Sequence, residues 1–380
     1  MKIAVVKEVR AAERRVAATP ETIKKLKGLG FDLAVEAGAG ALSYIADADY
    51  EAAGASVGDR ASVLNGADII LKVQGPDADE LAGYPRGAVL VASLNPYQNR
   101  ELMQAYANAG LTAMAMEFMP RITRAQSMDI LSSQSNLAGY KAVLDACEHF
   151  GRALPMMMTA AGTVPAAKAF IMGAGVAGLQ AIATAKRLGA IVSATDVRLA
   201  AKEQVESLGG KFVMVEDEET RQAETSGGYA KEMSDAYKAK QAALIADTIR
   251  KQDIVITTAL IPGRAAPRLV SAEMVASMQP GSVIVDLAAE QGGNCELTQP
   301  GEVVTTPNGV TIVGHRNVPS RLAANASALF SRNLFNFLAA FHDKEAKTVA
   351  WNWDDEILKA IVVTRDGAVV HPGLQATQAA

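Results

Sequence analysis

The stretch Ala169-Phe170-Ile171-Met172-Gly173-Ala174-Gly175-Val176-Ala177-Gly178 decides which fold this chain is expected to adopt. An apolar strand leads into glycines spaced Gly-x-Gly-x-x-Gly, and an amphipathic helix is expected over residues 176–188. In such a unit the first glycine permits the tight turn, the second lets the backbone approach a pyrophosphate, and the third lets helix and strand pack closely. The N-terminus of the helix then offers unpaired N–H groups to the anion. We therefore expect a dinucleotide-binding turn; a purely structural glycine turn is the alternative.

The next expected strand, residues 191–195, ends at Asp196, 18 residues after Gly178. A carboxylate at this position can accept hydrogen bonds from both hydroxyls of an adenosine ribose, and it would repel a 2′-phosphate. The sequence therefore predicts selectivity for NAD(H) over NADP(H). Arg198, two residues further on, is the one feature that could soften this preference.

Short strands and helices alternate on both sides of this unit, which predicts parallel sheets covered by helices on both faces. Ahead of the turn, strands are expected over residues 2–6, 31–35, 69–73, 89–94 and 112–117, helices over 21–29, 49–53 and 100–109, and a long linking helix over 130–150. Beyond it, a helix is expected over residues 201–208 and strands over 212–215, 254–258 and 282–286.

Length and composition place the chain among folded globular proteins of more than one domain. Its 380 residues exceed what one hydrophobic core usually organises, and 49% of them are hydrophobic against 21% charged. With 37 Lys and Arg against 41 Asp and Glu, there is no bulk electrostatic case for nucleic acid or an anionic membrane as partner. Two cysteines and four histidines without ligand spacing argue against a disulfide framework and against a metal site.

The sequence also argues against a membrane span and a secretion signal. The uncharged run 169–185 is 17 residues long, which is marginal for a spanning helix, and its glycines belong to the turn. The N-terminus enters a short strand pattern directly, without an apolar signal core or a cleavage site. We therefore expect a soluble chain.

A polar loop after the last strand of the first third carries side chains suited to positioning a nicotinamide ring. Ligands of open α/β sheets bind at the carboxyl ends of strands, so this loop can face a cleft. The Gln126 amide and the Ser127 and Ser132 hydroxyls could hold the carboxamide edge of the ring, while an ion pair between Arg121 and Asp129 fixes the loop. The alternative is a solvated loop in which Asp129 or Ser127 caps the following helix.

Residues 216–240 form a polar insertion in which 11 of 25 residues are charged. An insertion this polar within a compact domain is usually a surface loop, and the pair Gly227-Gly228 ahead of Tyr229 would give it hinge freedom. We expect this loop to be mobile without ligand and to order over bound nucleotide.

Four smaller features receive mainly structural interpretations. Met156 to Met158 are expected to pack in a core, since methionine fills irregular gaps. Trp351 and Trp353 suit one face of a strand, and the Asp-Gly pair within residues 363–370 predicts a hairpin. His315 follows an expected strand and could lie near a cleft.

Seven stretches of the chain are long and specific, far beyond a dinucleotide fingerprint. They are PRITRAQSMDILSSQSNLAGYKAV, TAAGTVPAAK, GAGVAGLQAIATAKRLGA, KEQVESLGGKF, GGYAKEMS, TTALIPG and SVIVDLAAEQGGNCE. Together they resemble the NAD(H)-binding subunit of proton-translocating nicotinamide nucleotide transhydrogenase. The resemblance runs from about residue 1 to residue 375.

The resemblance implies an α/β fold with two Rossmann-like, doubly wound parallel-sheet domains and a cleft between them, in a chain that forms a homodimer. Residues 1–135 and 320–380 would form the first domain, and residues 136–319 the NAD-binding domain. NADH bound to this chain would pass hydride to NADP⁺ on a partner subunit, coupled to proton translocation through membrane-spanning subunits. The chain would then be cytoplasmic and peripherally associated with the inner (plasma) membrane through these partners.

The family's Arg-Gln-Asp loop is present as Arg121, Gln126 and Asp129, followed by the matching Ser132; these four residues are implied to be catalytic. The family's mobile loop carries a tyrosine that closes on the nucleotide, and Tyr229 matches it. The residues expected to contact nucleotide are Arg121, Gln126, Asp129, Ser132, Gly173, Gly175, Val176, Gly178, Asp196, Val197, Arg198, Gly228, Tyr229, Gln241 and Leu260.

Alanine dehydrogenase shares this architecture and is the nearest alternative. That family needs a lysine for the substrate carboxylate and a histidine as acid and base. Lys72 resembles the lysine, but residues 89–96 contain no histidine. Hydride passage between two nicotinamides needs no general acid, so the absence favours the transhydrogenase interpretation. An amino acid oxidoreductase and an NADH-sensing binding module remain the alternative functions.

Overall fold

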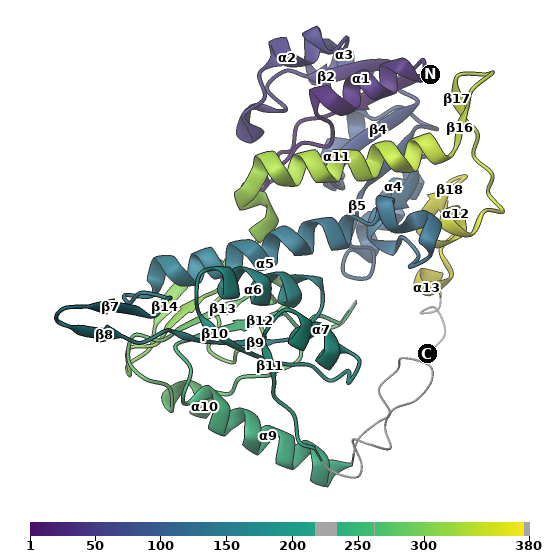
Figure 1. Cartoon of the computed structure of the whole chain (residues 1–380). Helices are drawn as coiled ribbons and strands as arrows, with labels where there is room; N and C mark the ends of the chain where they lie inside the picture. The colour runs from purple at the N-terminus through teal and green to yellow at the C-terminus, as the bar shows by residue number, and fades with distance from the viewer. Residues whose placement is uncertain (217–233, 262, 376–380) are drawn as a thin grey trace. The chain divides into compact units, whose positions relative to one another are not determined.

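The computed structural model describes residues 1–216, 234–261 and 263–375, in two compact units. Unit 1 consists of Met1–Gln134 and Ser320–Ala380, and unit 2 is the continuous segment Ser135–Pro319. The chain therefore begins in unit 1, completes unit 2 and then returns to unit 1 (Figure 1). Each unit has its own mainly parallel sheet with helices on both faces, which confirms the fold class expected from the sequence.

Unit 1 is built on an eight-stranded sheet in the order β19-β18-β6-β5-β4-β1-β2-β3. Its parallel strands are β1 (Lys2–Val5), β2 (Asp32–Glu36), β3 (Ser56–Gly58), β4 (Ile69–Gln74), β5 (Val89–Ser93) and β6 (Thr112–Ala115). At one edge, β18 (Val362–Arg365) and β19 (Ala368–Val369) add the hairpin that the Asp-Gly pair predicts. The parallel strands follow the order 3-2-1-4-5-6, which is the order of a dinucleotide-binding sheet.

The strand β1 shows why this sheet is covered on both faces. Ile3 and Val5 pack into one hydrophobic cluster, whereas Ala4 and Val6 pack into another, and all four side chains are fully buried. Because successive side chains of a strand point to opposite faces, an uninterrupted apolar run requires a covering layer on each side. The run therefore fits a central parallel strand.

Helices supply the two covering layers of unit 1. The first cluster is completed by α1 (Pro20–Gly28), α2 (Asp47–Ala52), α11 (Ala323–Ala340) and α12 (Glu356–Ile361). The second is completed by α3 (Arg60–Leu64) and α4 (Arg100–Asn108). The helix α11 was absent from the sequence expectation, although Phe330, Leu334, Phe337, Leu338 and Phe341 recur at helical spacing and are all buried.

Unit 2 repeats this arrangement with a seven-stranded sheet in the order β11-β10-β9-β12-β13-β15-β14. Its strands are β9 (Lys168–Met172), β10 (Ile191–Thr195), β11 (Lys211–Phe212), β12 (Ile254–Thr257), β13 (Val283–Asp286), β15 (Thr311–Val313) and the antiparallel edge strand β14 (Val303–Thr305). One face is covered by α5 (Ile130–His149), α6 (Val176–Arg187) and α7 (Ala201–Ser207), the other by α9 (Asp235–Ile249) and α10 (Ala272–Ala276) (Figure 1).

The expected loop 216–240 is shorter than predicted at its C-terminal end. Residues 235–240 belong to α9, whose N-terminus is capped by Ser234, because its hydroxyl accepts a hydrogen bond from the Tyr237 N–H. The expected lid residues Gly228 and Tyr229 lie outside the described residues.

Two expectations about large side chains were wrong. Met156 to Met158 do not pack in a core: Met157 begins β7 (Met157–Thr159), which pairs with β8 (Gly162–Val164), and the three side chains are 43–79% exposed. Trp351 and Trp353 do not lie in a strand. They do share a face, since their rings stack with centroids 6.0 Å apart. Spacing of two residues indicated the shared face but not the backbone that produces it.

Across the residues that the structure describes, we find no helix that is both long and apolar enough to cross a membrane.

Candidate functional site

The glycine-rich segment forms a tight turn between β9 and α6, where the strand order of the unit 2 sheet reverses. β9 lies between β10 and β12, and the turn is bonded to both neighbours. The Gly173 N–H donates to the Thr195 carbonyl at 2.8 Å, and Thr258 Oγ1 donates to the Gly173 carbonyl at 3.1 Å. Gly173 has a φ of +107°, which L side chains rarely adopt. Ligands of open α/β sheets bind at such switch points, so the turn occupies a binding position.

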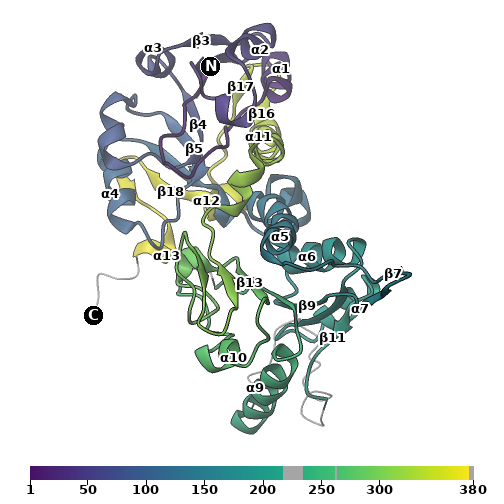
Figure 2. The same ribbon diagram turned by 90° about the vertical axis from the view of Figure 1, so that its left-hand side faces the viewer.

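The first turn of α6 is enclosed by two close backbone approaches. A Cβ atom at Gly178 would lie 1.8 Å from the Gly173 carbonyl oxygen. A Cβ atom at Gly139 of α5 would lie 2.0 Å from the Ala177 carbonyl oxygen, and α5 and α6 lie side by side in both views (Figure 2). In contrast, the Cβ position of Gly175 is open. Sequence reasoning identified Gly178 but missed Gly139, because nothing local marks a contact between two helices.

Asp196 follows β10 and is bonded to the glycine-rich turn. Its Oδ2 accepts from the Ala174 N–H at 2.7 Å and from Arg198 Nη2 at 3.0 Å; its Oδ1 accepts from the Arg198 N–H at 2.8 Å and from Arg198 Nε at 2.9 Å. Burial disfavours the ionised carboxyl, but these hydrogen bonds outweigh burial and hold the pKa of Asp196 below its usual range. Asp196 is therefore an ionised carboxylate at neutral pH.

Apolar side chains are exposed next to the turn, at the carboxyl ends of three adjacent strands. Val176 follows β9 and is 41% exposed, Val197 follows β10 and is 85% exposed, and Leu260 follows β12 and is 50% exposed. Exposed apolar side chains gathered at one edge of a sheet are typical of a ligand-binding surface. They offer contact area to flat rings beside the anion-binding turn.

Two buried or half-buried amides hold this edge in place. Gln241 of α9 donates from Nε2 to Thr195 Oγ1 at 3.3 Å, and its Oε1 accepts from the Val215 N–H at 2.8 Å. Asn294 is fully buried and binds the backbone of Ala259 twice, accepting from its N–H at 3.0 Å and donating to its carbonyl at 2.8 Å. The amide of Gln241, expected to contact nucleotide, is thus used within the protein. Asn294 was missed, because its partner is 35 residues away in sequence.

The polar loop of unit 1 follows β6 and is held differently from the expectation. Asp129 caps α5, since its carboxylate accepts from the N–H of Ser132 at 3.0 Å and also from the Ser132 hydroxyl. The expected ion pair between Arg121 and Asp129 is not formed among the described residues. Arg121 and Gln126 are exposed, and within the described ranges of the chain neither side chain makes a hydrogen bond or ion pair. The helix-capping alternative describes Asp129 correctly.

This loop is nevertheless anchored from two sides within unit 1. Asn333 and Asn336 of α11 both donate their side-chain N–H groups to the Ser127 carbonyl, at 2.9 and 3.1 Å. Arg124 forms an ion pair with Asp355 at 2.9 Å. Gln126 lies between these anchors in a 3-10 turn, Thr123–Met128. A free amide is therefore presented on a fixed backbone.

A second group of charged side chains is buried in unit 1, at the carboxyl ends of β1 and β4. Lys72 Nζ lies 3.5 Å from Glu8 Oε2 and 3.6 Å from Glu80 Oε1, and its side chain is 1% exposed. The Arg15 guanidinium binds both carboxylate oxygens of Glu13. Burial raises the pKa of Glu8 to about 7; Lys72 beside it acts in the opposite direction, and Glu13 adds to the rise.

Replacing Glu8 by glutamine should flatten the pH dependence of stability. The pKa of Glu8 in the folded chain exceeds its ordinary value of 4.5, so its stabilisation is complete below pH 4.5 and is lost as the pH rises through 7. The free energy of unfolding of wild type should therefore fall between pH 5 and 8 by on the order of 2 kcal/mol more than that of Glu8→Gln. Urea unfolding at both pH values measures this difference. The control is Glu51→Gln, an exposed side chain on α2, in which the free energy of unfolding should change with pH as it does in wild type. If Glu8→Gln showed that same pH dependence, the assignment would be contradicted.

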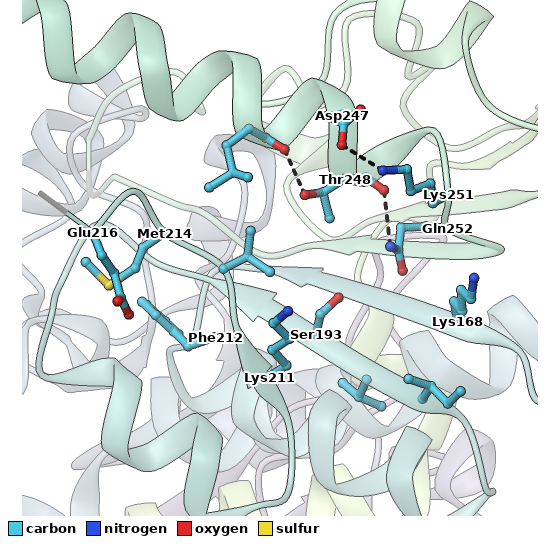
Figure 3. A pocket seen from close by; sticks show the side chains of 14 residues that line it. Lys168, Ser193, Lys211, Phe212, Met214, Glu216, Asp247, Thr248, Lys251 and Gln252 are labelled. Carbon is cyan, nitrogen blue, oxygen red and sulfur yellow. Dashed lines mark hydrogen bonds and ion pairs between the residues drawn. The ribbon is translucent and has the colours of Figure 1, made fainter.

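A pocket of about 440 Å³ lies in unit 2 between α9 and the strands β9, β10 and β11 (Figure 3). Its lining includes the first residues of these strands, Lys168, Ile191 and Lys211, and Thr248 and Gln252 at the other side. The glycine-rich turn and Asp196 follow the last residues of β9 and β10 instead. The pocket is therefore separate from the glycine-rich turn.

Comparison with known proteins places both units in one family. The sequence profile "Alanine dehydrogenase/PNT, N-terminal domain" matches residues 4–138, and "Alanine dehydrogenase/PNT, C-terminal domain" matches residues 142–372. The chain is 57% identical over 380 residues to an NAD(P) transhydrogenase alpha-subunit protein of Rhodospirillum rubrum, covering 98% of this chain and 99% of that protein.

A more distant relative and a solved structure support the same family assignment. The chain is 30% identical over 380 residues to an alanine dehydrogenase of Halomonas elongata, covering 98% of this chain and 95% of that protein. The crystal structure of a transhydrogenase from Sinorhizobium meliloti superposes with a TM-score of 0.89 at 59% identity, covering 97% of this chain and all of that one. These matches confirm the resemblance seen in the sequence: the chain belongs to the alanine dehydrogenase/PNT family, at markedly higher identity to its transhydrogenase members than to its alanine dehydrogenases.

Proposed function

We propose that this chain is the NAD(H)-binding subunit of a proton-translocating transhydrogenase, which binds NADH and passes hydride directly to NADP⁺ on a partner subunit. The observation that carries the proposal is the glycine-rich turn with Asp196 at the switch point of unit 2, in a chain that matches a transhydrogenase alpha subunit over nearly its whole length. The relatives' names supply the reaction, and the turn supplies a place for its nucleotide.

In this proposal unit 2 binds NADH through three features of one sheet edge. The pyrophosphate lies at the N-terminus of α6, where Gly175 leaves open space and the helix offers free N–H groups. The adenosine ribose is bound by Asp196, and Val176, Val197 and Leu260 contact the flat rings. A carboxylate at the ribose selects NAD(H), because a 2′-phosphate would be repelled.

The transfer step itself needs positioning rather than acid–base chemistry. The hydride, with its electron pair, leaves C4 of the dihydronicotinamide, which becomes NAD⁺, and adds to C4 of the NADP⁺ ring, which becomes NADPH. No proton is gained or lost at either carbon. We assign the orientation of the donor ring to Gln126, with Arg121, Asp129 and Ser132 on the same loop. The free amide of Gln126 on its anchored backbone supports this role.

The buried charges of unit 1 weigh against an alanine dehydrogenase activity. A substrate carboxylate would have to compete with Glu8 and Glu80 for Lys72. Residues 89–96 also lack the histidine that proton transfer to an amino acid substrate would require. The transhydrogenase reaction needs neither group.

We further propose that the chain acts as a homodimer, on the cytoplasmic side of the inner membrane, attached through NADP-binding and membrane-spanning partner subunits. The exposed hairpin of β7 and β8 supports self-association, since Met156, Met157, Met158 and Val164 together expose apolar surface on it. The relatives' designation as subunit alpha supports the presence of further subunits.

The decisive experiment mixes the purified chain with an NADP-binding transhydrogenase component, NADH and an NADP⁺ analogue whose reduced form absorbs apart from NADH. Reduction of the analogue should require both proteins. Light scattering on the purified chain alone should give the mass of a dimer.

Three results would contradict the proposal in whole or in one of its elements. NADH binding without any transfer would favour the NADH-sensing module, and NAD⁺-dependent oxidation of alanine would favour the amino acid oxidoreductase. A monomer mass at micromolar concentration would remove the homodimer.

A further inference from the structure

The carboxylate of Asp196 has no acceptor position left for a ligand. An ionised carboxylate offers about four lone-pair sites on its two oxygens. Four donors of the protein occupy them: the N–H groups of Ala174 and Arg198, and the Nε and Nη2 atoms of Arg198, all at 2.7–3.0 Å. A ribose hydroxyl can therefore bind Asp196 only after one of these donors leaves.

The side chain of Arg198 is the donor that can leave. The two backbone N–H groups cannot turn away from the carboxylate as a side chain can. Ala174 belongs to the tight turn, and the Arg198 N–H is part of the main chain only two residues after Asp196. The guanidinium is 48% exposed, and among the residues that the structure describes its only bonds are those to Asp196. Because the guanidinium faces solvent while the Asp196 carboxylate is only 7% exposed, the guanidinium is the partner that can return to water when a ligand takes its place.

We propose that Arg198 is a specificity-determining residue that acts as an internal competitor of the nucleotide ribose. This inference rests on the proposed binding of NAD(H) at Asp196. In the free protein the guanidinium occupies the ribose-binding face of the carboxylate and cancels its charge. Binding of NADH displaces the guanidinium from that face. With NADPH, the displaced guanidinium is beside the 2′-phosphate and offsets some of the repulsion from Asp196.

The two effects of Arg198 have opposite signs, which makes the inference testable. Removing the side chain should free the carboxylate for the ribose hydroxyls and tighten NADH binding by about threefold, because the ligand no longer has to displace a guanidinium that is itself half exposed. The same change should weaken NADPH binding, because the phosphate then meets an uncompensated carboxylate. The ratio of the NADPH to the NADH dissociation constant should therefore rise by about tenfold or more.

The experiment measures dissociation constants of NADH and NADPH by isothermal titration calorimetry for wild type, Arg198→Ala and Arg198→Lys, and for Asp196→Asn with and without Arg198→Ala. Arg198→Lys keeps the charge but cannot form a bidentate ion pair. Its ratio of the NADPH to the NADH dissociation constant should therefore lie between those of wild type and Arg198→Ala. In the Asp196→Asn background, Arg198→Ala should no longer tighten NADH binding. Arg187→Ala, an exposed arginine at the far end of α6, controls for net charge and should leave the ratio unchanged.

The outcomes separate this inference from the proposed function. A wild-type chain that binds neither nucleotide overturns the proposed function. If wild type binds NADH, two results would overturn the inference alone. One is a ratio of the NADPH to the NADH dissociation constant in Arg198→Ala that stays within twofold of wild type. The other is weaker NADH binding in Arg198→Ala than in wild type. Thermal unfolding of each variant, including Asp196→Asn at a side chain that is only 7% exposed, checks that the fold stays intact.

Discussion

Gly178→Ala should destabilise unit 2 by about 3 kcal/mol, because the new methyl group would lie 1.8 Å from the Gly173 carbonyl oxygen and must force α6 away from the turn. For a unit of this size, such a loss lowers the unfolding temperature by roughly 10 °C. The displaced helix N-terminus would also no longer point its N–H groups at the pyrophosphate, so NADH binding should weaken by more than about tenfold. Calorimetric unfolding and NADH titration measure the two effects.

Gly175→Ala is the matched control on the same turn, and it should separate folding from binding. Its Cβ position is open and its φ of −76° suits any L residue, so stability should change by less than about 0.5 kcal/mol. If pyrophosphate approaches the backbone here, however, the methyl group occupies its place and NADH binding should weaken by about tenfold. Unchanged NADH affinity in Gly175→Ala would remove the turn from the binding site. Wild-type stability in Gly178→Ala would contradict the close approach of α6.

The glycine positions also show how much of the fold could be predicted from sequence. The close approach of Gly178 to the Gly173 carbonyl joins residues only five positions apart, so spacing alone identified the turn and the two elements it joins. Continuous apolar runs such as β1 and β9 likewise reveal central parallel strands, since both of their faces are buried. Such local patterns were sufficient to predict the fold class.

The partners and surroundings of individual side chains were predicted less well than the fold class. Asp129 was assigned to Arg121 by chemical type, but the N–H of Ser132 three residues away is a nearer donor and captures the carboxylate. Met158 is apolar and was assigned to a core, although no other described element covers the hairpin that carries it in unit 2. The anchoring of the Gln126 loop by Asn333 joins positions more than 200 residues apart, which no local pattern reveals.

Gln126→Asn should lower the rate of hydride transfer to the partner's NADP⁺ by roughly tenfold or more, while the NADH dissociation constant stays within about threefold of wild type. Shortening the side chain by one methylene withdraws the amide from the ring without disturbing the loop, because the Gln126 side chain has no bond to any residue the structure describes. Hydride transfer requires donor and acceptor carbons near contact, and a shift of about 1 Å can cost roughly a hundredfold in rate. Stopped-flow kinetics on the reconstituted complex, with nucleotide binding measured in parallel, give both quantities.

Greater mobility of the loop backbone would also slow hydride transfer, and two controls distinguish this effect from a direct role of the amide. Thr123→Ala changes an exposed side chain in the same 3-10 turn and should leave both transfer and binding unchanged. Asn336→Ala removes one of the two bonds to the Ser127 carbonyl, and Asn333 retains the other, so its effect on transfer measures how strongly the loop backbone matters. If Asn336→Ala slows transfer as much as Gln126→Asn does, the anchored backbone and not the amide sets the rate. If Gln126→Asn slows transfer only in proportion to weaker NADH binding, Gln126 binds the nucleotide but does not orient it, because an interaction made equally in ground and transition states cannot change the transfer step alone.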